Sequence, residues 1–193
     1  MNSHGQSAAL SVLNRSAFAV QLRFYRDQHL TWDAWLAPGG DMSVPDPGQA
    51  DVEVSAVFTD ERSRVTYRVP TRVTGRSIRL VAKLLVSAGA LRFSLDTEPG
   101  SQADAIEIQN LCAGTVRFDT RFMHSPFTLT KVLGPAAVSS LALSGIEVAA
   151  IINGITTTRV AIRDWASELL IDSQPSQDHG LPTLKLVTRG HRQ

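Results

Sequence analysis

The sequence has little of what marks metal-binding, disulfide-bonded or strongly charged proteins. Its one cysteine, Cys112, excludes an intrachain disulfide and a cysteine-based metal site, and its apolar neighbours predict a buried core residue. The 19 Lys and Arg residues nearly balance 18 Asp and Glu residues, so no global field attracts nucleic acid or an anionic membrane. Hydrophobic residues make up 43% of the 193 residues and charged residues 19%, which is typical of a folded globular chain.

Motifs of common enzymes are also missing from the sequence. It has no P-loop, no dinucleotide-binding glycine pattern and no Gly-x-Ser-x-Gly elbow. Its histidines are His4, His29, His124, His179 and His191, and none has a second histidine at zinc-ligand spacing. We therefore expect a protein that is not an enzyme and that uses no metal or cofactor. A Ser-His-Asp triad, which is assembled in space, remains the open alternative.

The chain also lacks a recognisable export or membrane segment. Residues 1–7 show no basic stretch followed by an apolar run, which predicts synthesis in the cytoplasm without a Sec signal peptide. Incorporation into a particle and export by another route are both compatible with that start. The most apolar stretch, 132–155, carries one charge, Glu147, but Gly134, Pro135 and Asn153-Gly154 interrupt it. It predicts two short strands with a turn rather than a transmembrane segment.

Four short segments recur in the same order about 95 residues apart, which indicates an internal duplication. The pairs are 12–14 with 108–110, 36–38 with 133–135, 52–58 with 146–152, and 91–93 with 184–186, at offsets of 96, 97, 94 and 93 residues. A polar, turn-rich segment, 96–104, with Pro99-Gly100 at its centre, predicts the linker between the copies. The predicted domains are therefore residues 1–100 and 101–193.

Both halves alternate apolar and polar residues, as strands with one wet face do. The alternating runs are 18–25, 52–58, 65–73 and 91–95 in the first half, and 116–122, 146–152, 156–162 and 184–186 in the second. Turn residues such as Pro38-Gly39-Gly40 and Asn153-Gly154 separate these runs. We predict an all-β chain of two tandem antiparallel β-sandwiches, Ig-like or jelly-roll-like.

Two segments at comparable places in the halves do not follow this pattern. Residues 77–87 and 163–171 carry apolar side chains at helical spacing, such as Trp165 and Leu169 one turn apart. They predict one short helix in each half. Strands whose two faces are both covered are the alternative.

A series of arginines is the clearest candidate for a binding surface. Arg62, Arg64, Arg68, Arg72 and Arg76 share one parity and would line one face of an extended strand. The face is either simply solvated or a docking stripe for phosphate or for carboxylates of another chain. Aromatic residues do not interleave the series and the net charge is near zero, so the nucleic-acid signal is weak.

Two tryptophans are the second candidate feature. Trp32 and Trp35 stand three residues apart, which places them on opposite faces of a strand. We expect one in the core and one exposed, where a tryptophan can stack on a sugar or anchor an interface.

Together these features predict a non-enzymatic structural or interaction protein that associates with itself or with a larger protein assembly. A virion or particle accessory component fits this description. The candidate interface residues are Arg64, Arg68, Arg72, Arg76, Trp32 and Trp35. The alternative is a carbohydrate- or membrane-binding module, lectin-like or toxin-like, with its site in loops such as Trp32-Asp33 and His179-Gly180.

Overall fold

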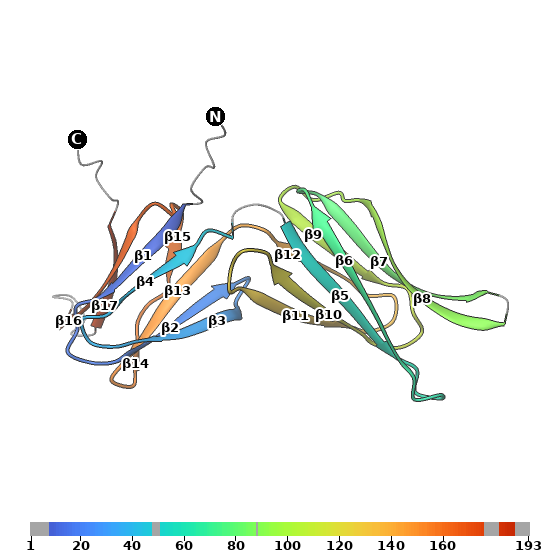
Figure 1. Cartoon of the computed structure of the whole chain (residues 1–193), viewed down its shortest axis with the longest axis horizontal. Helices are drawn as coiled ribbons and strands as arrows, with labels where there is room; N and C mark the ends of the chain where they lie inside the picture. Colours follow the sequence, from blue (N-terminus) through green and yellow to red (C-terminus); the bar gives the residue numbers. More distant parts are fainter. Residues whose placement is uncertain (1–7, 48–50, 88, 176–181, 188–193) are drawn as a thin grey trace. The chain divides into compact units, whose positions relative to one another are not determined.

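A computed structural model describes residues 8–47, 51–87, 89–175 and 182–187 (Figure 1). These residues form strands and turns without a helix, so the predicted all-β class is confirmed. Over the same ranges, no helix has the length and hydropathy needed to span a membrane. The strands build four sheets, which we name A to D.

The chain divides into two compact units, and the first comprises Met1–Asp46 together with Gly145–Gln193. It contains sheets A and B. Sheet A has the strand order β17 (Pro182–Val187), β16 (Glu168–Pro175), β1 (Ala9–Asn14), β4 (Asp41–Pro45). Sheet B has the order β14 (Ile155–Thr156), β13 (Ile146–Ile152), β2 (Val20–Arg26), β3 (His29–Leu36), and β15 (Val160–Ile162) also pairs with β13.

The second unit, Pro47–Ser144, contains sheets C and D. Sheet C has the order β11 (Thr128–Leu133), β10 (Val116–Phe122), β5 (Asp51–Thr59), β6 (Thr66–Thr74). Sheet D has the order β12 (Val138–Ala142), β9 (Ala105–Asn110), β7 (Ile78–Ser87), β8 (Ala90–Pro99). The predicted antiparallel pairing holds for most strands, but β1 with β16 and β7 with β9 are parallel pairs.

The boundary between the units differs from the predicted division into 1–100 and 101–193. Strands β1–β4 pair with β13–β17, whereas β9–β12 pair with β5–β8, so each unit takes strands from both predicted halves. The predicted linker, 96–104, lies inside the second unit. Turn composition identifies where the chain bends, but it carries no information about which distant strands pair.

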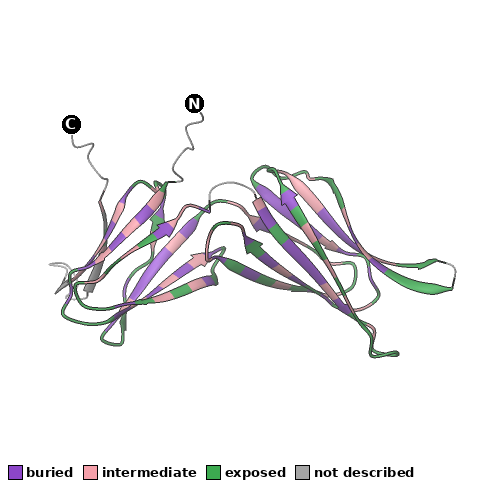
Figure 2. Ribbon diagram, viewed as in Figure 1, coloured by how far each residue is buried: buried purple, intermediate pink, exposed green. Residues whose placement is uncertain are grey.

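Each unit buries side chains from both of its sheets. Strands β2 and β10 show the predicted alternation, with every second residue buried (Figure 2). In the second unit, Phe58 of sheet C stacks on Phe93 of sheet D with ring centroids 5.7 Å apart. Burying a side chain of this size contributes about 1.5–3 kcal/mol, so the alternating buried residues stabilise each unit.

The predicted short helices are wrong. Residues 78–87 form strand β7, while Arg163–Ser167 form a turn that precedes strand β16. Both strands lie between two others in their sheets, and β7 buries three consecutive residues, Leu80, Val81 and Ala82. A central strand covered on both faces carries apolar residues at every position, and such a run also fits helical spacing.

Candidate functional site

The arginine series is only partly a strand feature. Arg62 and Arg64 lie in the turn between β5 and β6, where Arg64 has a φ of 56°. Arg68 and Arg72 project from the exposed side of β6, and Arg76 follows the end of that strand. Strand β6 is an edge strand, which explains how it accommodates Pro70. The structure therefore places two of the five arginines on one sheet face.

Acidic residues of the same unit neutralise part of this series. Arg72 donates two hydrogen bonds to Asp51, at 2.8 Å from Nε and 2.6 Å from Nη2, and this contact lowers the pKa of Asp51. Arg76 forms an ion pair with Asp104 at 2.9 Å. Arg68 points Nε at the hydroxyl of Ser55, 3.4 Å away. This part of the surface therefore does not present a row of unpaired cations to a phosphate.

Two further arginines share the outer face of sheet C, by which we mean the solvent-facing side of β11, β10, β5 and β6. Arg117 and Arg121 of β10 are exposed, and Val57 of β5 lies between Arg117 and Arg68 in the sheet register. Asp119 pairs with Arg117 at 3.0 Å. The alternation of β10 was predictable from the sequence, but its pairing beside β5 was not. The face carries both signs of charge.

The two tryptophans lie in the first unit, away from the sequence segment that holds the arginines. Trp32 stacks on Phe24 with ring centroids 5.0 Å apart and is half-buried. Trp35 is 68% exposed. One exposed ring was expected and Trp35 is exposed, whereas the other ring was expected in the core and Trp32 is only half-buried. The candidate residues thus belong to surfaces on two separate units.

Polar side chains surround Trp35 on the outer face of sheet B, the solvent-facing side of β3, β2 and β13. Trp35 lies opposite Gln21 in the register of β2 and β3. Gln21 Nε2 donates to Asp33 at 2.8 Å, and Arg23 donates to Gln21 Oε1 at 3.4 Å. These bonds hold planar polar groups beside an exposed aromatic ring, an arrangement that can bind a protein or a sugar.

The outer face of sheet B continues to β13 and the segment before β15. The guanidinium of Arg159 lies 3.8 Å from the centroid of the Tyr25 ring and 3.4 Å from Glu147. A cation over an aromatic face is worth about 0.5–1 kcal/mol at an exposed position. The Arg159 side chain is therefore held in place by Tyr25 and Glu147 of the same face.

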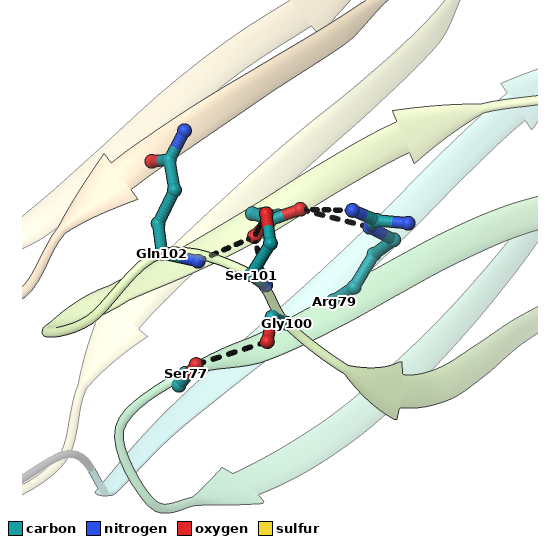
Figure 3. A network of polar contacts seen from close by, with 6 residues as sticks. Ser77, Arg79, Gly100, Ser101 and Gln102 are labelled. Atoms are coloured by element: carbon teal, nitrogen blue, oxygen red, sulfur yellow. Dashed lines mark hydrogen bonds and ion pairs between the residues drawn. The ribbon is translucent and has the colours of Figure 1, made fainter.

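A buried carboxylate in the second unit was not anticipated from the sequence (Figure 3). Glu107 of β9 is 4% exposed and accepts hydrogen bonds from the Ser101 hydroxyl, the Arg79 guanidinium, and the main-chain N–H groups of Ser101 and Gln102. These donors, Ser101 and Arg79 foremost, lower its pKa to about 2. The network fixes the predicted linker against β7 and β9.

In the part of the chain that the structure describes, no three His, Cys, Asp or Glu residues are grouped to hold an ion. His29 and His124 are exposed, whereas His4, His179 and His191 lie outside the described residues. The loop His179-Gly180, proposed as a binding loop, is likewise outside them. Cys112 is buried as predicted, and burial raises its pKa to about 11.

Comparison of the chain with protein-family models, with curated proteins and with solved structures gave no match. The proposals below therefore depend on the residues and geometry described above.

Proposed function

We propose that the chain is an internal duplication folded as two tandem β-sandwiches that exchange strands between the copies. The strand orders support this interpretation, since β17-β16-β1-β4 in sheet A corresponds to β8-β7-β9-β12 in sheet D. The registers agree as well, because Val20 pairs with Ile152 and Val116 pairs with Phe58. Those are the positions that the sequence offsets of 96 and 94 bring together. The limits 1–100 and 101–193 would then bound the copies rather than the folded units.

The proposed function is that of a non-enzymatic interaction protein that assembles through its sheet surfaces, as a particle component does. One observation carries it: both units expose a large apolar side chain at corresponding places on an outer sheet face. Trp35 is 68% exposed opposite Gln21, and Val132 is 61% exposed opposite Arg117. An exposed apolar residue set among paired charges resembles a protein-binding surface. Two such faces would make the chain bivalent.

Mixed charge favours protein over polyanion as the partner. On the outer face of sheet C, the arginines alternate with carboxylates, and Asp51 and Asp119 already hold Arg72 and Arg117. Such a surface can match a partner that also carries both signs, whereas it offers little net attraction to nucleic acid.

The test is the native mass of the purified chain, measured by light scattering over a concentration series. We expect a mass above that of the 20.9 kDa chain, and a lower mass for the double variant W35D/V132D. The variant L111D is the control, because Leu111 is 51% exposed but lies in the loop after β9. A monomer at all concentrations, or a double variant that assembles normally, overturns the assembly through these faces.

Carbohydrate binding by the outer face of sheet B is a second candidate. The specific observation is the Gln21–Asp33 hydrogen bond of 2.8 Å beside the exposed Trp35 ring, since sugars bind to aromatic faces flanked by planar polar groups. A glycan array with the parent chain and W35A tests it. Binding that disappears in W35A supports the candidate, and an array without any signal removes it.

A further inference from the structure

Strands β7 and β8 extend beyond the rest of sheet D as a two-stranded ribbon (Figure 1). Their pairing continues from Ile78 opposite Pro99 to Ser87 opposite Ala90. Strand β9, the other neighbour of β7, pairs only as far as Ala82. We call residues 83–94 the distal ribbon.

The distal ribbon exposes large apolar side chains on both of its faces. Leu85 is 49%, Val86 74% and Leu91 41% exposed, and Figure 2 shows the ribbon as largely exposed. Val86 lies opposite Leu91 on one face, whereas Leu85 lies opposite Arg92 on the other face. The stretch between Lys83 and Arg92 contains no charged residue. Three large exposed apolar residues within seven positions form the densest such group in the described chain.

One main-chain edge of the distal ribbon is open. The last contact along that edge of β7 is the hydrogen bond that Leu111 N–H donates to Ala82 C=O at 2.9 Å. Main-chain groups alternate in direction along a strand, so those of Leu84 and Val86 point to the same edge beyond the end of β9. Among the described residues, no strand pairs with β7 there.

Two other edges of the protein carry features that prevent strands from pairing between molecules. Edge strand β6 has Arg68, Pro70 and Arg72. At edge strand β12, Lys131 Nζ donates to the main-chain oxygen of Ser140. Beyond Lys83, the distal part of β7 has none of these features.

We propose that the distal ribbon binds the distal ribbon of a second copy of this chain, edge to edge along β7. A closed pair of identical chains is related by a two-fold axis, which makes the two β7 strands antiparallel. Leu84 of one copy then exchanges main-chain hydrogen bonds with Val86 of the other, and Leu85 lies opposite Leu85. The proposal rests on the proposed function as an assembling protein, and it names the partner and the contact.

The open edge favours a second copy over a lipid membrane. Unpaired N–H and C=O groups cost several kcal/mol each in a hydrocarbon environment, so an open ribbon does not insert readily. A β-strand of a second copy satisfies those groups and covers the apolar side chains together. Because four hydrogen bonds and a short ribbon form a small interface, we expect association that depends on concentration.

Cysteine cross-linking tests the register. In L85C the two new thiols face one another at a non-hydrogen-bonded pair, where Cα atoms lie about 4.5 Å apart and a disulfide fits. We expect a covalent dimer under mild oxidation. V86C is the matched control: Val86 is more exposed than Leu85, yet its opposite residue is Leu84, so its cross-linking should be at least tenfold slower. Equal rates for the two variants, or no dimer with L85C, overturn the proposal.

A charge on the edge tests the contact without a cross-link. V86K should move the midpoint of association at least tenfold to higher concentration, whereas V138K, at a residue 57% exposed on β12, should leave it unchanged. An unchanged midpoint for V86K overturns the proposal. Flotation with phosphatidylcholine vesicles tests whether the ribbon binds lipid instead. If the parent chain binds the vesicles, V86K abolishes this binding and no dimer forms, the ribbon is a membrane-binding element and the proposed dimer contact is overturned.

The outcomes separate this proposal from the proposed function. An assembly that W35D/V132D dissociates but that L85C does not cross-link removes the ribbon contact alone. If L85C traps a dimer and W35D/V132D leaves the native mass of the parent assembly unchanged, the ribbon contact is supported and assembly through the outer faces is removed.

Discussion

Asn14 and Asn110 make corresponding hydrogen bonds at corresponding places in the two units. The side-chain amide of Asn14 donates to the carbonyls of Phe18, Leu36 and Ala37 at 2.8, 3.2 and 2.9 Å. That of Asn110 donates to Gly114, Leu133 and Gly134 at 2.8, 3.0 and 2.9 Å. Both asparagines are fully buried. Each side chain joins the turn after one strand to the end of another strand in its unit.

Replacing either asparagine should therefore destabilise its unit. N14A leaves buried carbonyls without the amide donor, and we expect a loss of about 2–3 kcal/mol in the free energy of unfolding. Urea unfolding followed by tryptophan fluorescence reports on the first unit, because Trp32, Trp35 and Trp165 all lie in it. N14D separates the roles of the two amide atoms, since it keeps the oxygen that accepts from Ser16.

N110A should produce a comparable loss in the second unit, measured by circular dichroism. A change below 0.5 kcal/mol in both alanine variants, on the order of an average surface substitution, would show that the asparagines are dispensable.

Much of the core could be predicted from alternation, because period-two burial is a local property of strands. The matched segments 52–58 and 146–152 do pair with β10 and β2 in corresponding registers. The match of 91–93 with 184–186 is four residues out of step, since Leu184 pairs with Ile171 whereas Leu95, not Leu91, pairs with Ala82. Short apolar matches do not determine register once loop lengths differ.

The surfaces were harder to predict than the core. Because Arg64, Arg68 and Arg72 are separated by even numbers of residues, they were predicted to lie on one face of a strand. Arg64 instead lies in a turn before the strand, where its φ is positive. The pairing of Arg72 with Asp51 brings together residues 21 positions apart, and that of Arg79 with Glu107 joins residues 28 apart. Such contacts depend on which strands become neighbours, and a single sequence does not specify this.

The Glu107 network predicts a dependence of stability on pH. The pKa of Glu107 is lowered to about 2 from 4.5, so the unfolded chain binds the proton more tightly. The stabilisation is complete above about pH 4.5 and is lost as the pH falls toward 2. E107Q should have a lower urea midpoint than the parent at pH 7, and the difference should shrink across that window. E61Q, at an exposed turn residue, is the control. If the difference in urea midpoint between E107Q and the parent does not change with pH, the stabilisation does not come from the ionised carboxylate of Glu107.

Gly100 should tolerate no side chain. A Cβ built there would lie 2.8 Å from the nitrogen of Ile78 and 2.9 Å from the carbonyl carbon of Ser77, both main-chain atoms. G100A must displace the turn that Ser77 and Gly100 hold together, and we expect a loss of about 1–3 kcal/mol, as for other overpacked sites. G134A is the matched control, because its Cβ meets nothing within 4 Å. If G100A and G134A unfold at the same temperature, the close approach of Gly100 to the main chain of Ser77 and Ile78 would be refuted.

Cys112 should be unreactive in the folded chain and replaceable by serine. Cys112 is 3% exposed and burial raises the pKa of its thiol to about 11, so little thiolate is present at pH 8. Labelling by a disulfide reagent should require unfolding, with a rate that rises with urea concentration. In the first unit Ser16 occupies the corresponding place, and its hydroxyl donates to Asn14 Oδ1 at 2.7 Å. C112S can make the same bond to Asn110, so we expect a stability within about 1 kcal/mol of the parent. Rapid labelling under native conditions, or a large loss of stability in C112S, would contradict this correspondence between the units.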